Sequence, residues 1–210
     1  MVDFRFYLIS DRTRCAGRSL ALALRQACRA GVRAVQIREK DLETPELLAL
    51  TRRVQRELDT LRPALFINGN PEVAVACGAQ GIHLPERSMP VRLVRTALDR
   101  LPAGTLIGRS THSLKAARAA EAEGADFITF GPVFDTPSKA AYGPPRGLQA
   151  LSESVRAVTI PVFALGGVTP GRAEQCLEAG AHGVAAISAV LSQPDIPVAV
   201  GAFETELGGL

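Results

Sequence analysis

Tryptophan is absent from this 210-residue chain, and the only aromatic side chains are 8 Phe and 2 Tyr. So few aromatic rings offer little surface on which nucleic-acid bases could stack. The charges nearly balance as well: 24 Lys and Arg against 21 Asp and Glu give a net charge of +3. The basic residues are scattered along the chain. A nucleic-acid-binding protein usually gathers its basic residues on one face. We therefore expect no nucleic-acid partner and favour anionic small molecules.

Long hydrophobic runs and closely spaced cysteines are also missing. No stretch of about 18 uncharged apolar residues could span a bilayer, and the acid-bearing N-terminus lacks the layout of a signal peptide. The cysteines lie far apart, at Cys15, Cys28, Cys77 and Cys176. This spacing argues against a zinc site or a disulfide framework. We expect buried free thiols in a cytoplasmic protein that has no membrane partner.

Short apolar runs alternate with amphipathic segments along the whole chain, which is typical of buried parallel strands covered by helices. The expected strands are residues 4–9, 34–37, 64–67, 81–84, 105–108, 127–130, 162–165 and 183–187. Expected helices include residues 20–30, 45–58, 91–98, 114–123 and 171–179. Thr44 and Thr169 each precede a proline, as an N-cap precedes position N1, and Ser113 can also cap a helix.

An internal repeat organises these elements. Four segments read helix, glycine, small residue and strand, with the glycines at Gly31, Gly78, Gly124 and Gly180. Each glycine is expected to end a helix in the left-handed conformation. Four such βαβα units give eight parallel strands, so we predict one (β/α)₈ TIM barrel domain over residues 1–210. The alternative, an open doubly wound sheet, would need a glycine-rich loop after the first strand, and residues 10–14 contain no glycine.

The last two strands carry a candidate phosphate site. Active sites of TIM barrels lie at the carboxyl ends of the strands, and phosphate sites commonly follow strands seven and eight. Gly166 and Gly167 follow the seventh expected strand, and Ser188 follows the eighth. Glycines let backbone N–H groups approach an anion, and a helix N-terminus attracts it. A tight turn is the alternative interpretation, but both loops carry the feature, so we favour phosphate binding.

Histidines and basic residues supply further candidates. His112 follows Ser110 at the end of a strand, and an imidazole titrates near neutral pH, so His112 is the strongest candidate acid or base. Helix capping or packing is its alternative role. His83 lies within an apolar strand and is expected to pack structurally, whereas His182 is expected at the surface of the opposite rim. Arg38 and Lys40 can bind an anionic group or form a solvated loop pair.

An ordered set of motifs resembles the thiamine phosphate synthase superfamily. The motifs are residues 7–11, 35–40, 107–113, 131–134 with Lys139, 160–167, and 183–185 with Ser188. Each motif alone is weak, but together they cover nearly the whole chain in order. The resemblance implies a barrel that acts on a thiazole phosphate. The substrate-binding residues that it implies are Gln36, Arg38, Lys40, Asn68, Ser110, Thr136, Lys139, Gly166, Gly167, Ile187 and Ser188.

The superfamily has a synthase branch, which joins hydroxymethylpyrimidine pyrophosphate to the thiazole phosphate with Mg²⁺. Its metal-binding aspartates match Gly69 and Ser88 here, so both carboxylates are missing, and Glu86 is the only nearby substitute. The basic residues that bind pyrophosphate match Arg38, Lys40 and Lys139.

The second branch, thiazole tautomerase, aromatises a carboxythiazole phosphate. Its pattern is similar to Asn68-Gly69, Leu84-Pro85 and residues 108–113 here, and its catalytic histidine matches His112. The chain departs slightly from this pattern at Lys40, where some tautomerases carry Arg. We therefore predict a tautomerase without cofactor or metal that takes a small-molecule thiazole phosphate. A Mg²⁺-dependent synthase and a non-catalytic binding or regulatory paralogue are the alternatives, and a homodimer stays open.

Overall fold

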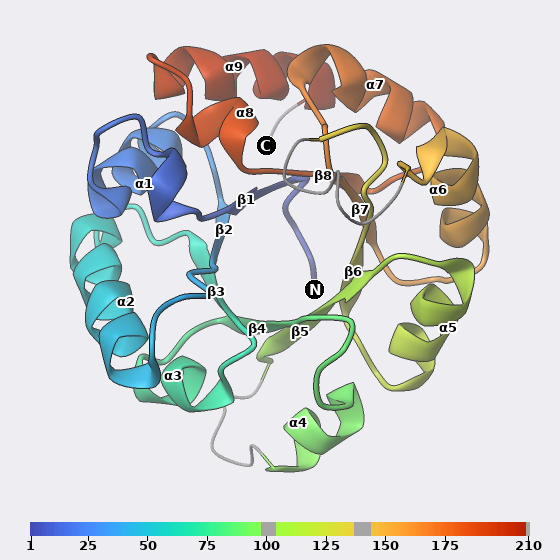
Figure 1. The fold of residues 1–210 in the computed structure, drawn as a ribbon, viewed down its shortest axis with the longest axis horizontal. Helices are drawn as coiled ribbons and strands as arrows, with labels where there is room; N and C mark the ends of the chain where they lie inside the picture. Colours follow the sequence, from blue (N-terminus) through green and yellow to red (C-terminus); the bar gives the residue numbers. More distant parts are fainter. Residues whose placement is uncertain (98–103, 137–143, 209–210) are drawn as a thin grey trace.

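The computed structural model describes residues 1–97, 104–136 and 144–208. Within them, eight parallel strands close into a barrel in sequence order, as Figure 1 shows. The strands are β1 (Phe6–Ile9), β2 (Ala34–Ile37), β3 (Ala64–Asn68), β4 (Gly81–Leu84), β5 (Leu106–Thr111), β6 (Phe127–Phe130), β7 (Val162–Leu165) and β8 (Gly183–Ala186). The predicted (β/α)₈ barrel is confirmed.

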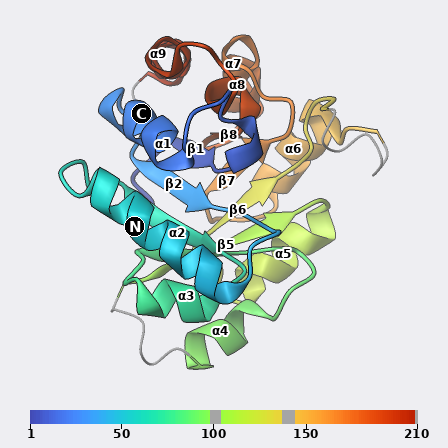
Figure 2. The ribbon, with the colours of Figure 1, turned by 60° about the vertical axis from the view of Figure 1, so that its left-hand side comes forward.

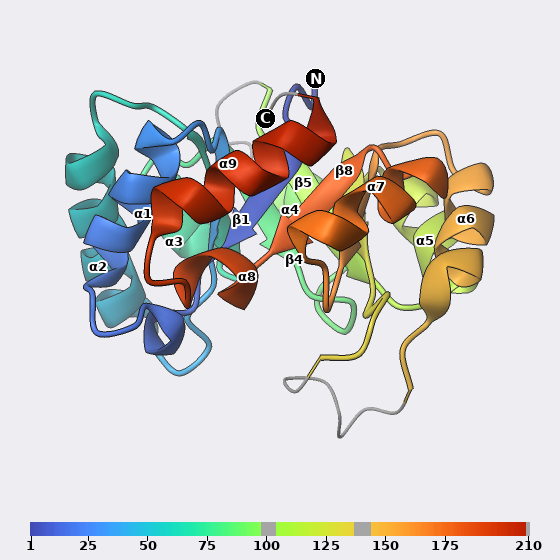
Figure 3. The same cartoon turned by 90° about the horizontal axis from the view of Figure 1, so that it is seen from above.

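Helices cover the outside of the barrel (Figure 2). They are α1 (Leu20–Arg29), α2 (Thr44–Leu58), α3 (Pro71–Ala76), α4 (Val91–Ala97), α5 (Leu114–Ala122), α6 (Gly147–Arg156), α7 (Pro170–Glu178), α8 (Ser188–Leu191) and α9 (Ile196–Leu207), with the 3₁₀ turn η1 (Arg12–Arg14) after β1. The amino terminus and the carboxyl end of α9 lie at the same end of the barrel (Figure 3).

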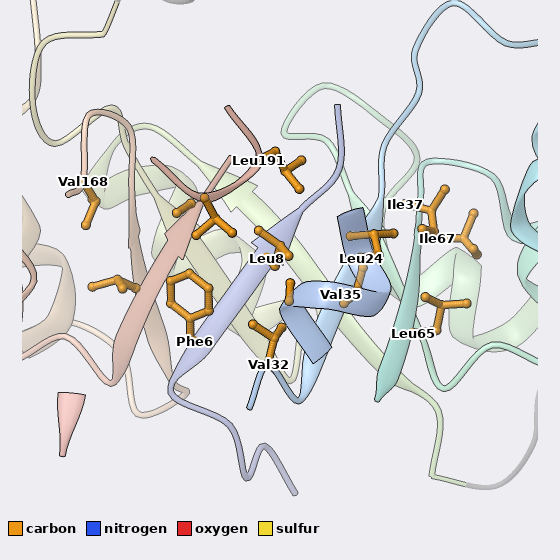
Figure 4. Packing of buried hydrophobic residues seen from close by; sticks show 14 of the residues in the cluster. Phe6, Leu8, Leu24, Val32, Val35, Ile37, Leu65, Ile67, Val168 and Leu191 are labelled. Atoms are coloured by element: carbon orange, nitrogen blue, oxygen red, sulfur yellow. The ribbon is translucent and has the colours of Figure 1, made fainter. Parts of the chain in front are cut away.

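Alternate strand residues enter two separate cores, because successive side chains of a strand point to opposite faces. On β1, Phe6 and Leu8 belong to the large core between strands and helices. Figure 4 shows Leu8 in this layer near Leu24 of α1. Tyr7 and Ile9 belong to the smaller core inside the barrel. This alternation fixes which later residues of each strand face the barrel interior.

Aromatic rings fill the amino-terminal end of the barrel interior. The ring of Phe4 lies 5.2–5.9 Å from the rings of Tyr7, Phe66, Phe127 and Phe163, measured between centroids. These partners come from four strands, so the Phe4 ring packs across this end of the barrel and fills it. Phe4 precedes β1, which begins at Phe6, so the sequence prediction of a strand from residue 4 is two residues too long.

The helix ends match the sequence expectation with one exception. The four repeat glycines all have positive φ, from 60° at Gly78 to 115° at Gly31. Ser113 caps α5 by accepting the N–H of Ala116 at 3.2 Å, and Thr169 is the N-cap of α7. Thr44 is not an N-cap, because α2 begins at Thr44 itself and Glu43 precedes it as the cap.

The cysteines are free thiols, with Cys15, Cys28 and Cys176 buried and Cys77 partly buried. In the described part of the chain, no helix is both long enough and apolar enough to cross a membrane.

Candidate functional site

A ring of polar side chains lines the carboxyl end of the barrel. Strand alternation carries the inward face from the interior core to the last strand residues. Phe66 is inward, so Asn68 is inward as well, and it pairs in register with His83. On β5, Gly108 pairs with His83 and meets it at close range, so Ser110 also faces inward. These residues lie together on the inward face at the carboxyl end of the barrel.

Gln36 and Ile187 join the same ring. Gln36 is buried and donates a hydrogen bond from Nε2 to the hydroxyl of Tyr7 at 3.1 Å. Ile187 directly follows β8 and contacts the interior core. The structure thus brings Gln36, Asn68, Ser110 and Ile187 to one rim.

His112 directly follows β5, which ends at Thr111. Its ring Nδ1 hydrogen-bonds to the carbonyl oxygen of Gly131, and its backbone N–H donates to Glu86 Oε1 at 3.1 Å. A carbonyl can only accept, so Nδ1 carries the proton and Nε2 of the neutral ring holds a lone pair. His112 is half-buried, and its Nε2 can therefore serve as a base.

Arg109 braces the segment that contacts His112. It points away from the barrel interior because it neighbours the inward residues Gly108 and Ser110. Its guanidinium donates to the carbonyl oxygens of Met89 at 2.7 Å and of Glu86 at 2.8 Å. These bonds fix the connection between β4 and α4, and with it the carboxylate that holds the His112 backbone. The sequence pattern alone assigns Arg109 no role of its own.

A network at the ends of β1 and β2 sets the position of Arg38. Ser10 Oγ accepts the backbone N–H of Arg38 at 2.8 Å and donates to Glu39 Oε1 at 2.5 Å. Arg12 pairs with Glu39 and with Asp41. Arg12 thus holds both carboxylates.

Arg38 itself makes no ion pair with any described residue. Burial lowers the pKa of its guanidinium, which nearby Asp11 and Glu39 partly offset. A half-buried guanidinium that pairs with no carboxylate suits an anionic ligand group. Lys40 is exposed on the loop that follows.

Gly166 and Gly167 form a braced turn after β7. Both have positive φ, 94° and 66°. The carbonyl of Gly166 accepts the N–H of Phe134 at 2.9 Å, and that of Gly167 accepts Arg172 Nη1 at 2.8 Å. The guanidinium of Arg172 also stacks 4.8 Å above the Phe134 ring. Because these contacts fix the turn, its amides are preorganised.

The segment after β8 places Ser188 at the first position of α8, where it is exposed. The first N–H groups of a helix lack intrahelical partners. The two predicted phosphate-binding segments therefore follow neighbouring strands at one rim, since β7 pairs with β8.

Of the other predicted residues, Thr136 is half-buried in the connection after β6. Lys139 lies outside the described residues.

The other two histidines lie deeper in the molecule. His83 is buried, as predicted, and its Nε2 lies 3.0 Å from Ser110 Oγ. Burial, with smaller contributions from Arg38 and Arg109, lowers the pKa of His83 to about 3. His182 lies at the amino-terminal end as expected, but the prediction of a surface position is wrong in part. It is half-buried, edge-on to Phe163, with Nε2 3.1 Å from the carbonyl oxygen of Phe4.

The lowered pKa of His83 predicts acid sensitivity. An unfolded histidine titrates near pH 6.5, whereas His83 stays neutral in the folded barrel, so the unfolded state binds more protons below that pH. His83 therefore stabilises the fold fully above about pH 6.5, and this contribution falls as pH falls toward 3. We expect a slope of up to about 1.4 kcal/mol per pH unit in the free energy of unfolding.

Urea unfolding of the wild type and of His83→Gln at pH 7.5, 6.0 and 5.0 measures this contribution. The variant should show the shallower loss of stability toward low pH. Parallel pH profiles for the two proteins would contradict the prediction.

The donor set at the rim does not fit Mg²⁺, which prefers carboxylate oxygens. Glu86 accepts the N–H of His112, and the positions matching the superfamily's metal-binding aspartates are Gly69 and Ser88. The hydroxyl of Ser88 donates to the carbonyl oxygen of Pro85 at 2.7 Å. Nowhere in the described ranges do three His, Cys, Asp or Glu side chains gather as a metal site would require.

Comparison with known proteins shows that this chain is similar to thiamine-phosphate synthases. A family model described as thiamine monophosphate synthase matches residues 6–190. A putative thiamine-phosphate synthase of Geobacter sulfurreducens is 48% identical over 194 residues, which cover 92% of this chain and 90% of that protein. The thiamine-phosphate synthase of Clostridium novyi is 36% identical over 195 residues, covering 93% and 94%.

A solved structure agrees. Thiamine phosphate pyrophosphorylase from Pyrococcus furiosus superimposes with a TM-score of 0.86 at 29% identity, covering 97% of this chain and 95% of that one. Sequence and fold therefore point to the same family across nearly the full length of the chain.

Proposed function

Because the chain belongs to the thiamine monophosphate synthase family, we propose that it acts in thiamine biosynthesis as a thiazole tautomerase. The observation that carries this proposal is the setting of His112. Its Nδ1 is held by the Gly131 carbonyl and its backbone by Glu86, so the imidazole is anchored and its Nε2 would serve as the base. Histidine is the side chain that most often transfers a proton in this way.

The proposed reaction moves one proton. His112 Nε2 takes the proton from the ring carbon that bears the carboxylate, and the electron pair of that C–H bond enters the ring. The exocyclic double bond becomes a single bond as its outer carbon accepts a proton, which the imidazolium returns. The numbers of atoms and electrons are unchanged, and the ring becomes aromatic.

The other proposed contacts hold the substrate. Gly166, Gly167 and Ser188 would bind its phosphate, with Lys139 and Thr136 in the neighbouring connection. Arg38 and Lys40 would face the carboxylate and stabilise the negative charge that develops as the proton leaves. Gln36, Asn68, Ser110 and Ile187 would surround the ring.

The second candidate is a thiamine-phosphate synthase, and the names of the relatives favour it. The Geobacter sulfurreducens and Clostridium novyi proteins both carry that name, one of them as putative. This function would join a pyrimidine pyrophosphate to a thiazole phosphate and would require Mg²⁺. The missing aspartates at Gly69 and Ser88 weigh against it.

Two assays on the full-length protein separate the candidates. The first follows aromatisation of the carboxythiazole phosphate by ultraviolet absorbance with a chelator present. The second supplies both synthase substrates with Mg²⁺ and measures thiamine phosphate. We expect turnover in the first assay and none in the second. The reverse result would establish the synthase, and tight binding of thiazole phosphate without turnover in either assay would indicate a non-catalytic paralogue.

The cytoplasmic location and the homodimer that the sequence leaves open stay predictions.

A further inference from the structure

One buried imidazole contacts a hydroxyl group at the proposed site. His83 is 1% exposed on β4, and its Nε2 lies 3.0 Å from Ser110 Oγ, a hydrogen-bonding distance. Thr129 Oγ1 is farther from the same nitrogen, at 3.5 Å. Ser110 is half-buried near the carboxyl end of β5, whereas His83 lies on β4 at the level of Gly108, two residues nearer the amino-terminal end of the barrel. The proton on this short contact decides what Ser110 can offer to a ligand.

The other ring nitrogen has no partner. Among the described residues, nothing hydrogen-bonds to His83 Nδ1, which is buried. This edge of the ring packs on the backbone of Gly108 so closely that a methyl group there would lie 2.6 Å from Nδ1. Only the absence of a side chain at Gly108 allows the imidazole to sit here.

The two neutral tautomers differ in the group that they leave unpaired. With the proton on Nδ1, a buried N–H would have no acceptor, and orphaned N–H groups are rare in proteins. With the proton on Nε2, only a lone pair is unpaired, and Nε2–H donates to Ser110 Oγ. The charged ring, which would carry both protons, is disfavoured by burial and by the positive charges of Arg38 and Arg109.

We infer that His83 is a positioning residue that donates from Nε2 to Ser110 Oγ and so turns the Ser110 hydroxyl into a hydrogen-bond donor toward the barrel mouth. A hydroxyl whose oxygen already accepts from below directs its own hydrogen elsewhere. The Ser110 hydrogen is then available to an acceptor on the ligand, such as a carboxylate or phosphate oxygen or an unprotonated ring nitrogen. This inference rests on the proposed function only in taking Ser110 as a ligand contact.

Nuclear magnetic resonance tests the tautomer directly. In protein carrying ¹⁵N-histidine, two-bond ¹H–¹⁵N spectra at pH 7.5 distinguish a ring protonated on Nε2 from one protonated on Nδ1. The His83→Gln variant identifies the His83 signals. We expect the proton on Nε2. A proton on Nδ1, or a doubly protonated ring, would overturn the inference whether or not the enzyme is a tautomerase.

A double-mutant cycle tests the connection to Ser110. The probe is the aromatic thiazole phosphate, and calorimetry measures its affinity. His83→Phe keeps a ring but removes the donor and should weaken binding about three- to ten-fold, the effect of one hydrogen bond. His83→Gln keeps an amide donor near the Nε2 position and should recover part of the loss. Circular dichroism confirms that each variant folds.

The Ser110→Ala background gives the decisive comparison. If His83 acts through the Ser110 hydroxyl, His83→Phe should change the affinity little once that hydroxyl is gone. Equal losses in both backgrounds would show that His83 affects the barrel generally and would refute the positioning role. A protein that keeps the Nε2 tautomer but aromatises no substrate would instead refute the proposed function and leave the tautomer assignment intact.

Discussion

Replacing His112 by asparagine is expected to slow aromatisation of the carboxythiazole phosphate by about 10²–10⁴-fold, the usual contribution of a general base. An asparagine amide nitrogen can occupy the place of Nδ1 and keep the hydrogen bond to the Gly131 carbonyl. The side chain is then still anchored, but the basic nitrogen at Nε2 is lost. The affinity for thiazole phosphate should change by less than about three-fold, because one retained hydrogen bond anchors the side chain.

The matched control is His182→Gln. His182 lies at the amino-terminal end of the barrel, where its Nε2 approaches the Phe4 carbonyl, and glutamine keeps a donor there. This variant should aromatise substrate at the wild-type rate. Unchanged turnover in His112→Asn, measured by ultraviolet absorbance with folding verified, would remove His112 from the mechanism.

Replacing Gly166 by alanine is expected to destabilise the barrel by about 3 kcal/mol. Its φ of 94° lies in a region that costs a non-glycine residue about 1–3 kcal/mol. The new Cβ would also lie 2.6 Å from Pro132 Cα, a backbone atom that cannot move alone, and overpacking costs about 1–3 kcal/mol. Urea unfolding gives the free-energy change.

Gly166→Ala should also weaken binding of thiazole phosphate, because the turn that presents the amides must shift. Gly171→Ala is the matched control, since Gly171 lies nearby in α7 with nothing within 4 Å of an added Cβ. Alanine there should be neutral or stabilising by about 0.4–1 kcal/mol. Equal stabilities and affinities in the two variants would contradict the proposed role of the Gly166 turn.

The barrel was predictable because its signals are local. Apolar runs of four to six residues and the four glycines that end helices lie within short windows, so they predict the strand order without any knowledge of distant contacts. The candidate site was predictable to the extent that it follows strand ends. Asn68 and Ser110 could be placed at one rim because all carboxyl ends of a parallel barrel share that rim.

The contacts between these residues could not be predicted, because they join distant parts of the chain. Glu86 holds the backbone of His112 across 26 residues, and Ser10 reaches Glu39 across 29. The apolar run around His83 predicted its burial but not its contact with Ser110. The sequence predicted the wrong cap for α2, because Thr44 before Pro45 has the favoured N-cap chemistry whereas the backbone places Glu43 at that position.

The aromatic cluster around Phe4 determines from which end of the barrel a small molecule can enter and leave. Rings from four strands fill the amino-terminal end of the barrel, so among the described residues the polar carboxyl end is the side from which a small molecule reaches the interior. The product must then leave by the same route as the substrate enters, so product release and substrate binding compete. In the proposed tautomerase, slow release of the product would then limit turnover even when the proton transfer is fast.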